Sequence, residues 1–252
     1  MNVTAIVPAA GASTRFGRDK LGQDLGGRPV LVRTVEALTR REEIRHIIVA
    51  APPNQLEPFK ERFGPVLGFH GARIVPGSEV DRWDTVRSAL AHVPAESTHI
   101  AVHDAARPCV GEALFDRLFE AAASLDAVVP AISVTSTIKE VDASSGIDVA
   151  EADLLADAIL GAAGSPTLEA RQVRRTVSRA GLVLAQTPQV FAAGVLEAAF
   201  AGAPEGATDE AEVVERAGQP VYVLDGDPLN IKVTLREDLP LAAAILRAAG
   251  EL

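Results

Sequence analysis

The stretch that decides the fold is AIVPAAGASTRFGRDK, residues 5–20. It begins as a short apolar run, passes through proline and alanines to Gly11, and then brings three cations together: Arg15, Arg18 and Lys20. Ligands of open α/β sheets bind where a strand ends, at its carboxyl end. We therefore predict a phosphate-binding loop here, in which backbone amides, Arg15 and Lys20 converge on a triphosphate.

Two familiar phosphate motifs do not match this loop. A dinucleotide fingerprint, G-x-G-x-x-G, needs a close pair of glycines, but only Gly11 and Gly17 are present. A P-loop needs glycine, lysine and a hydroxyl residue in sequence, but Arg18 follows Gly17 and the glycine spacing is one residue too long. A nicotinamide-dependent oxidoreductase is therefore disfavoured. A glycine-rich turn with solvated cations remains the alternative to a phosphate site.

Outward from this loop, short β-branched runs alternate with amphipathic stretches. Asn54 and Asp81 precede two of these stretches as expected helix N-caps. Such alternation is typical of a mainly parallel sheet between two layers of helices. We predict a Rossmann-like, three-layer α/β/α fold with strands at 3–8, 46–51, 72–76, 98–103 and 126–134.

The region 135–190 breaks the alternation. TSTIKEVD and RQVRRTVSR are expected as an outgoing and a returning strand, with a turn at Gly146 and a helix over 149–162 between them. Within a single domain, 1–252, we predict a projecting β-arm, 135–181, that carries a helical insertion. After the arm we expect a strand near 182–186, helices near 192–201 and 209–217, strands at 220–225 and 229–234, and a closing helix from 236.

Composition narrows the classes of function. The 252 residues carry a formal net charge of −10, which argues against nucleic-acid or anionic-membrane partners. The single cysteine allows no internal disulfide. No signal peptide is evident, and no apolar run approaches the ~20 residues of a membrane helix. We expect a cytoplasmic protein.

A second candidate site follows the fourth expected strand, in VHDAARP, residues 102–108. Asp104 stands at the carboxyl end of that strand, where a carboxylate can hold Mg²⁺ or a sugar hydroxyl. Arg107 can bind a phosphate through two nitrogens. The alternative is that Asp104 merely caps the turn.

Together these segments resemble 2-C-methyl-D-erythritol 4-phosphate cytidylyltransferases, which belong to the sugar-nucleotidyltransferase superfamily. The resemblance covers almost the whole chain. VHDAARP, TPQ-x-F and NIK-x-T together are highly specific, whereas the first loop marks only the superfamily. The matching segments are VPAAGASTRFGRDK, PGSEVDRWDTVRSAL, VHDAARP, TIKEVD, TVSRAGLVLAQTPQVF, ATDEAEVVERAG and GDPLNIKVTLREDL.

The resemblance implies the family's nucleotidyltransferase fold and its reaction. CMP passes from CTP to a sugar-alcohol phosphate with release of pyrophosphate, using Mg²⁺ or another divalent cation, in the non-mevalonate route to isoprenoids. Attack of one phosphate on another is opposed by repulsion, so catalysis requires in-line positioning and neutralised charge. A nucleophilic side chain and an acid–base pair are not required.

By position in the motifs, two pairs of cations would be catalytic. Arg15 and Lys20 resemble the pair that stabilises the pentacoordinate transition state. Arg179 and Lys232 resemble the pair that positions the acceptor's phosphate. Two alternatives stay open, namely that a neighbouring arginine replaces Arg179 and that Lys232 is a solvated strand lysine.

The resemblance also implies the substrate-binding residues. Around the cytidine it places Ala9, Ala10, Gly11, Gly77, Ser78 and Thr85. On the acceptor side it places Arg107, Thr137 and Lys139. Asp104 would hold ribose or the metal ion, and Thr208 with Asp209 falls at the family's acidic motif. For these last two, helix capping alone is the alternative.

This sequence departs from the family pattern at several positions. Asp19 stands where the family usually has proline, Leu21 where it has glutamine, and Thr85 where it has serine. The PGSEVDR loop is longer than usual, which shifts the expected cytosine pocket by a residue or two. The arm carries an insertion of roughly 143–170, in a segment that in the family reaches across a homodimer. We still expect a homodimer through 135–181, because TIK and TVSR flank the insertion.

Two other functions remain to be separated from this one. A relative acting on another alditol phosphate, notably ribitol 5-phosphate, would keep the chemistry and differ in the arm. A non-catalytic nucleotide-binding regulator would keep the fold alone. The complete cation set at 15, 20, 179 and 232 counts against the regulator, since binding alone would not require all four.

Overall fold

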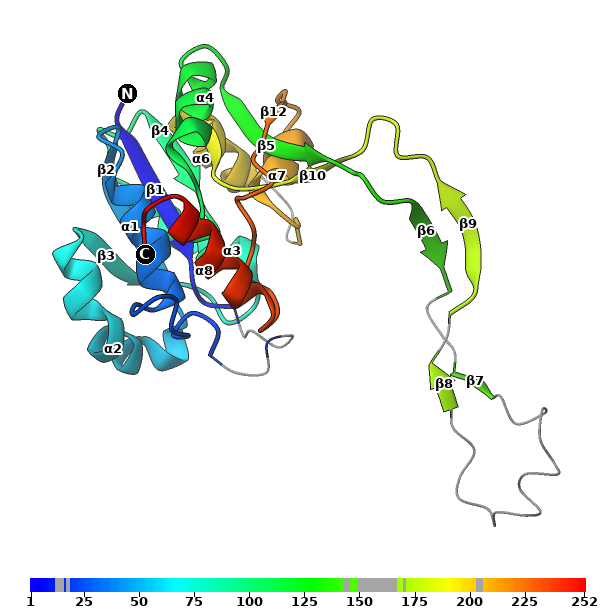
Figure 1. Cartoon of the computed structure of the whole chain (residues 1–252). Helices are drawn as coiled ribbons and strands as arrows, with labels where there is room; N and C mark the ends of the chain where they lie inside the picture. The colour runs from blue at the N-terminus through cyan, green and yellow to red at the C-terminus, as the bar shows by residue number, and fades with distance from the viewer. Residues whose placement is uncertain (12–15, 17–18, 143–145, 149–166, 170, 203–205) are drawn as a thin grey trace. The chain divides into compact units, whose positions relative to one another are not determined.

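The computed structural model describes the chain except residues 12–15, 17–18, 143–145, 149–166, 170 and 203–205 (Figure 1). By its contacts the chain divides into two compact units, Met1–Ile132 with Ala185–Leu252, and Ser133–Leu184. The predicted arm, 135–181, falls within the smaller unit. The predicted helix over 149–162 lies outside the described residues.

The main sheet of the chain is mixed and mainly parallel, in the order β10-β5-β11-β4-β1-β2-β3, with β12 also paired to β5. Strand β1 runs parallel to β2 and β4, while β11 is antiparallel to β4 and β5. This arrangement confirms the predicted fold class. The strands are β1 (Val3–Pro8), β2 (Ile44–Ala51), β3 (Ala72–Pro76), β4 (His99–Val102), β5 (Ala127–Ser133), β10 (Val183–Ala185), β11 (Gln189–Ala192) and β12 (Tyr222–Asp225).

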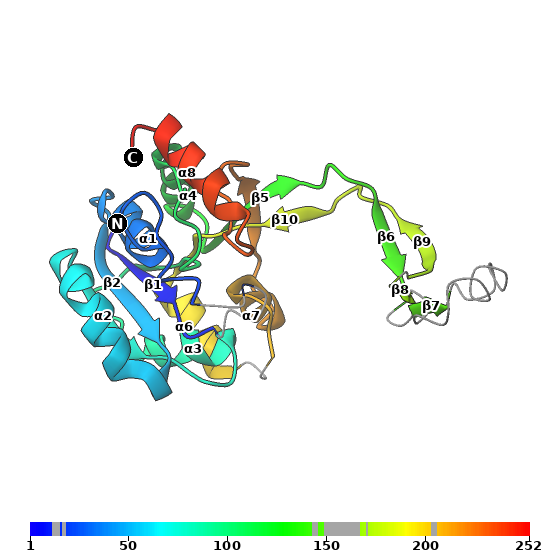
Figure 2. The ribbon, with the colours of Figure 1, turned by 60° about the horizontal axis from the view of Figure 1, so that its bottom comes forward.

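Helices cover both faces of this sheet (Figure 2). Along β1, Ala5 and Val7 pack into one apolar cluster and Ile6 into the other, as the alternation of a strand requires. The first cluster contains side chains from α1 (Val30–Thr39), α2 (Leu56–Phe69), α4 (Glu112–Ala122) and α8 (Asp238–Ala248). The second contains side chains from α3 (Arg82–Leu90), α6 (Ala193–Gly202) and α7 (Glu210–Arg216). These two cores fix the strand ends that form the site.

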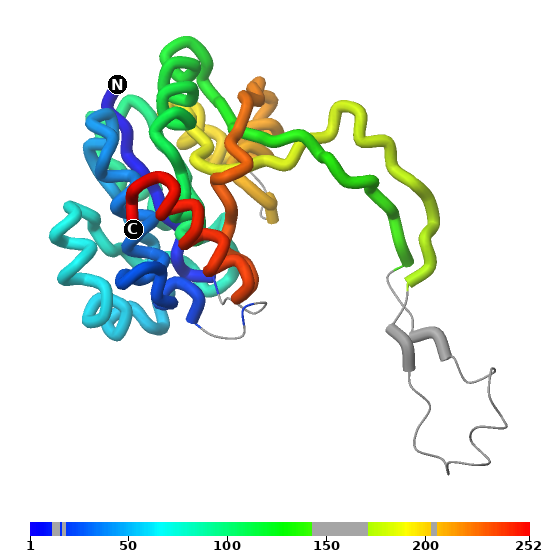
Figure 3. The backbone as a smooth tube through the Cα atoms, viewed as in Figure 1, coloured from blue at the N-terminus to red at the C-terminus, as the bar shows by residue number. Residues whose placement is uncertain are grey.

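The smaller unit contains two short antiparallel pairs. Strand β6 (Ile138–Val141) pairs with β9 (Val173–Val177), and their backbones run side by side in Figure 3. Strand β7 (Gly146–Asp148) pairs with β8 (Thr167–Glu169). The predicted turn at Gly146 is therefore wrong, because Gly146 pairs with Glu169 and the chain extends through it.

Two further predictions of local structure are corrected. Residues 229–234 form no strand, because Ile231 N–H donates to Leu229 O (2.8 Å) and Val233 N–H to Ala106 O (2.8 Å), outside any ladder. Asn54 does not cap α2, since it lies in a short 3-10 turn, Pro53–Gln55. The predicted cap at Asp81 is confirmed, because its carboxylate accepts the Asp84 N–H at 2.8 Å. None of the described helices is long and apolar enough to cross a membrane.

Candidate active site

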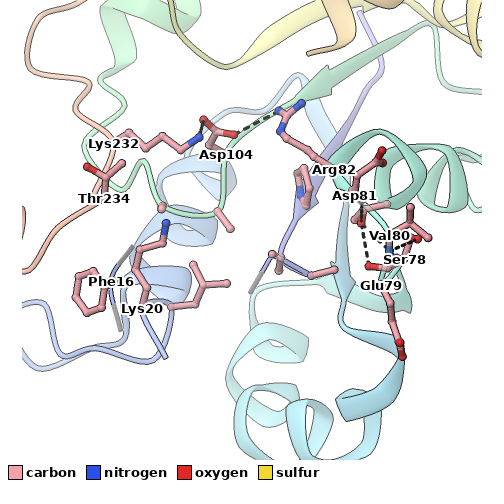
Figure 4. A pocket seen from close by; sticks show the side chains of 18 residues that line it. Phe16, Lys20, Ser78, Glu79, Val80, Asp81, Arg82, Asp104, Lys232 and Thr234 are labelled. Atoms are coloured by element: carbon pink, nitrogen blue, oxygen red, sulfur yellow. Dashed lines mark hydrogen bonds and ion pairs between the residues drawn. The ribbon is translucent and has the colours of Figure 1, made fainter. Parts of the chain in front are cut away.

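A cavity of about 420 Å³ lies where β1 and β4 end, at the carboxyl edge of the sheet (Figure 4). Its wall is built by the loop after β1, the loop before α3, the loop after β4 and the irregular segment before α8. The residues lining it are Pro8, Ala9, Ala10, Gly11, Phe16, Lys20, Leu21, Ser78, Glu79, Val80, Asp81, Arg82, Thr85, Asp104, Ala105, Ala106, Lys232 and Thr234.

The loop after β1 supplies small residues and a lysine. Ala9 N–H donates to Ala50 O at 2.8 Å, so the loop leaves the sheet edge in a fixed direction. Lys20 extends toward the cavity in Figure 4. Arg15, the other predicted transition-state cation, lies outside the described residues.

Asp19, the departure before this lysine, fastens the loop rather than stiffening it as proline would. Its carboxylate accepts the Gly22 N–H at 3.1 Å and forms an ion pair with Arg62 of α2. The Asp19 carbonyl accepts from the Gln23 side chain at 2.7 Å. The chain on either side of Lys20 is thereby tied to α2.

The loop before α3 is held by a glycine and a threonine. A Cβ on Gly77 would lie 2.9 Å from Thr85 Cγ2 and 3.1 Å from Ala51 O, so glycine is required by close approach. Thr85 Oγ1 accepts the Ser78 N–H (3.2 Å) and donates to Asp81 O (2.8 Å). Ser78 and Thr85 thus line the cavity, whereas Gly77 lies behind the lining and shapes it.

Asp104 lies at the end of β4 with three cations around it. Its Oδ1 is 3.3 Å from Arg82 Nη2, and its Oδ2 is 2.9 Å from Lys232 Nζ and 3.2 Å from Arg107 Nε. Burial alone would raise the pKa of Asp104, but Arg82, then Lys232 and Arg107, hold it far below the usual range. Asp104 therefore stays ionised, and Lys232 is a paired cavity lysine rather than a solvated strand residue.

Arg107, predicted on the acceptor side, is largely buried within the protein. Besides Asp104 it donates through Nη1 to Asn230 O at 2.8 Å, and its side chain is 11% exposed. It joins the VHDAARP loop to the NIK segment. The Arg107 guanidinium does not line the cavity, and it contacts a lining residue only through its ion pair with Asp104.

The described residues at this cavity do not form a site that would hold a metal ion by themselves. Mg²⁺ needs near-octahedral oxygen ligands, but both carboxylate oxygens of Asp104 already bind cations. Among the residues that the structure describes, no group of three His, Cys, Asp or Glu side chains could bind a metal. The role of Asp104 as a metal ligand stays a prediction.

Sequence reasoning missed two residues of this cluster. Arg82 Nη1 lies 2.5 Å from Glu210 Oε1 while its Nη2 contacts Asp104. Burial alone would lower the pKa of Arg82, but Glu210 and then Asp104 raise it. The available signal was that Arg82 and Glu210 each follow an N-cap aspartate.

The acidic motif at 208–209 serves mainly as a helix start. Asp209 Oδ1 accepts the Glu212 N–H at 2.9 Å, and its Oδ2 accepts from Gln189 Nε2 at 2.8 Å. The Thr208 hydroxyl donates to Glu212 Oε2 at 2.8 Å. Neither Thr208 nor Asp209 lines the described cavity, and the contacts of both fit helix capping, while the substrate-binding role of Asp209 stays a prediction.

A buried histidine supports the backbone of Asp104. His103 Nε2 is 3.0 Å from Arg107 O, and because a carbonyl only accepts, this nitrogen carries the proton. Nδ1 then accepts from the Thr187 hydroxyl (3.1 Å), whose oxygen accepts the Asp104 N–H (3.0 Å). Burial lowers the pKa of His103 to about 4, so it is neutral at physiological pH.

The three remaining predicted residues, Thr137, Lys139 and Arg179, lie in the smaller unit. Lys139 Nζ donates to Thr176 Oγ1 at 2.7 Å, across the β6–β9 pair. Arg179 donates to the backbone carbonyl of Thr135. Neighbouring arginines of β9 bind carboxylates instead, Arg174 that of Asp142 and Arg175 that of Glu140.

Comparison with known proteins identifies the family. The family model of 2-C-methyl-D-erythritol 4-phosphate cytidylyltransferase (IspD) matches residues 3–159 and 149–248. This chain belongs to that family. The resemblance inferred from the sequence motifs is confirmed.

Named relatives cover nearly all of this IspD-family chain. The 2-C-methyl-D-erythritol 4-phosphate cytidylyltransferase of Frankia casuarinae is 39% identical over 249 residues, 97% of this chain and 81% of its own. That of Saccharopolyspora erythraea is 35% identical over 98% of this chain and 100% of its own. The crystal structure of the Thermus thermophilus enzyme has a TM-score of 0.72 at 29% identity, covering 98% of this chain and 100% of that one.

Proposed function

We infer that this chain transfers CMP from CTP to 2-C-methyl-D-erythritol 4-phosphate in isoprenoid biosynthesis. The products are 4-diphosphocytidyl-2-C-methyl-D-erythritol and pyrophosphate. The observation that carries this assignment is the cavity at the carboxyl ends of β1 and β4, which Lys20 lines and where Arg82 and Lys232 bind one ionised aspartate, Asp104. Family membership supplies the substrates that such a site would take.

The cytidine would occupy the side of the cavity made by small residues. Ala9, Ala10 and Gly11 let backbone groups approach the ligand, and Ser78 offers a hydroxyl beside them. The Gly77–Thr85 packing fixes this wall before the ligand arrives. A prepared wall of this kind lowers the entropic cost of binding a nucleotide.

The triphosphate would lie toward Lys20. Attack by the acceptor's phosphate builds negative charge on the oxygens around the α-phosphorus, and a fixed ammonium stabilises that charge without reorganisation. Arg15 is proposed as its partner by its place in the motif. Because the nucleophile is already an anionic phosphate oxygen, no side chain has to remove a proton.

Asp104 is proposed to orient Lys232 and to bind the ribose. Its Oδ2 lies 2.9 Å from Lys232 Nζ, so the ammonium is kept at the cavity where it can position the acceptor's phosphate. The depressed pKa of Asp104 keeps this ion pair intact at physiological pH. Arg107 fastens the same carboxylate from the protein side.

The smaller unit is proposed to supply Thr137, Lys139 and Arg179 to the acceptor side, within a homodimer formed through 135–181. Arg174 and Arg175 already neutralise carboxylates, whereas Arg179 donates to the backbone carbonyl of Thr135. This difference favours Arg179 over its neighbours as the phosphate-positioning arginine. We also propose a cytoplasmic enzyme without nucleic-acid or membrane partners, in keeping with the net charge of −10.

Mg²⁺, or another divalent cation, is proposed to enter with CTP, held by the triphosphate oxygens. This follows from the crowded state of Asp104 and from the tendency of Mg²⁺ to use substrate phosphates with few protein ligands. When bound, the ion would neutralise triphosphate charge.

The direct test is pyrophosphate release by purified protein. With CTP and Mg²⁺ we expect turnover on 2-C-methyl-D-erythritol 4-phosphate and none after removal of divalent ions with EDTA. Turnover on ribitol 5-phosphate alone would assign the alternative acceptor. Binding of CTP without turnover on either acceptor would instead support the non-catalytic regulator.

A further inference from the structure

Glu210 is a buried carboxylate that the reaction described above does not use. It is the first residue of α7 and is 1% exposed. One oxygen, Oε1, lies 2.5 Å from Arg82 Nη1. The other, Oε2, is buried and has no hydrogen-bond partner among the described residues. Burial raises the pKa of Glu210 and the charge of Arg82 opposes that rise, so the ionised carboxylate depends on this one partner.

Its partner, Arg82, stands between two carboxylates. Nη1 contacts Glu210 and Nη2 contacts Asp104 Oδ1 at 3.3 Å, so one guanidinium joins α7 to the end of β4. Arg82 is itself the first residue of α3, directly after the Asp81 cap. A cation at a helix N-terminus is unfavourable, which makes the carboxylates necessary to hold it there.

Arg82 is divided between two acids, and this leaves the second oxygen of Asp104 to other cations. With Glu210 in place, Arg82 occupies Oδ1 of Asp104, and Oδ2 is shared by Lys232 and Arg107. Without the charge of Glu210, both guanidinium nitrogens are available to Asp104. Arg82 would then compete with Lys232 for the same carboxylate, and the ammonium would lose its fixed position.

We propose that Glu210 is a positioning residue for the cytidylyl transfer. It holds Arg82 on one oxygen of Asp104 and so leaves the other oxygen to Lys232 and Arg107. The path is a continuous chain of ion pairs, Glu210–Arg82–Asp104–Lys232, of which the last three members line the cavity in Figure 4. The identity of the reaction rests on the proposed function, while the ion-pair chain stands on the geometry.

The test compares Glu210→Gln, Arg82→Met and the double variant by steady-state kinetics with CTP and 2-C-methyl-D-erythritol 4-phosphate. Glu215→Gln is the matched control, because Glu215 is exposed on the same helix. We expect Glu210→Gln to lower kcat at least ~10-fold, on the scale of losing a preorganised charge, and the control to stay within about twofold of wild type. Thermal unfolding of each variant separates loss of folded protein from loss of positioning.

The double variant makes the test specific. If Glu210 acts only through Arg82, adding Glu210→Gln to Arg82→Met causes no further loss of kcat. This comparison holds even where Glu210→Gln alone folds poorly, because the double variant removes both members of the buried pair.

Three results have distinct meanings. An unchanged kcat for Glu210→Gln, or losses that multiply in the double variant, would overturn the role of Glu210. A kcat that is lost in Glu210→Gln and not lowered further in the Arg82→Met background would support it. A wild-type protein without activity would instead count against the proposed function.

Discussion

At the scale of single residues, Lys20 extends into the cavity from the loop after β1, where a triphosphate would meet it. An ammonium that acts on the transition state affects turnover, whereas one that only binds the ground state affects KM. The two roles can be separated by kinetics.

We predict that Lys20→Ala lowers kcat at least ~100-fold, as does loss of a preorganised transition-state donor elsewhere. Lys60→Ala is the control, since Lys60 lies on α2, paired with Glu57 at 2.7 Å and away from the cavity lining. A change confined to KM would show that Lys20 only binds substrate.

His103 gives the protein a specific sensitivity to acid. Its pKa is lowered from 6.5 to about 4, so the neutral form is favoured by folding and the unfolded chain binds the extra proton first. The stabilisation is complete above pH 6.5, amounts to about 3 kcal/mol, and is lost as the pH falls toward 4.

We therefore expect wild type to lose about 2 kcal/mol more of its unfolding free energy between pH 7.5 and pH 5 than His103→Gln does. Urea titrations at both pH values give this difference, and groups that titrate in both variants cancel. Equal pH dependence in the two proteins would show that His103 is not held neutral.

Residues beside strand ends were predictable, and residues joined across the fold were not. Asp104 and Lys20 were found because motifs place them after β4 and β1. Arg82 and Glu210 are 128 positions apart, and no local pattern links them. Gly77 was placed near the correct wall, but its close approach to Thr85 can be seen only in three dimensions.

At the scale of elements, the loop before α3 depends on its helix cap. The Asp81 side chain accepts the Asp84 N–H, and its carbonyl accepts from the Thr85 hydroxyl at 2.8 Å. Asp81 therefore caps α3 and also holds Thr85, which lines the cavity on the side proposed to bind cytidine.

Replacing this cap tests the link. We predict that Asp81→Ala costs about 1 kcal/mol of unfolding free energy and that Asp81→Ser, which can also cap, restores most of it. The measurement is denaturant unfolding, with KM for CTP recorded in parallel. Equal stability of the alanine variant and wild type would contradict the role of the cap.

Strands with continuous β-branched runs were predicted well, because a strand that is buried on both faces consists of nearly continuous apolar residues. Residues 229–234 misled the prediction because Ile231 and Val233 alternate as in a strand. Val233 is indeed buried, yet its N–H bonds to Ala106 in the loop after β4. The alternation correctly indicated that Val233 is buried, but it wrongly indicated that the Val233 N–H bonds to a neighbouring strand.

At the scale of the whole molecule, the proposal requires two parts of the chain to cooperate. Lys20 belongs to the larger unit and Arg179 to the smaller one. In the proposed homodimer, the arm of one subunit would complete the site of the other. The expected insertion at 143–170 falls largely outside the described residues and stays a prediction from the sequence.

Mixing two inactive variants tests this arrangement. Lys20→Ala and Arg179→Ala, unfolded and refolded together, would form mixed dimers in which one site has both residues intact. For random pairing we expect roughly a quarter of wild-type activity, because half the dimers are mixed and each has one complete site. No recovery above the separate variants would mean that the arm does not act across a dimer.

The most direct measurement offers the purified enzyme CTP, Mg²⁺ and an equimolar mixture of 2-C-methyl-D-erythritol 4-phosphate and ribitol 5-phosphate, with the products identified by mass. The account predicts 4-diphosphocytidyl-2-C-methyl-D-erythritol as the main product, formed with one pyrophosphate for each CTP consumed. A product made only from ribitol 5-phosphate, or CTP left unconsumed, would contradict it.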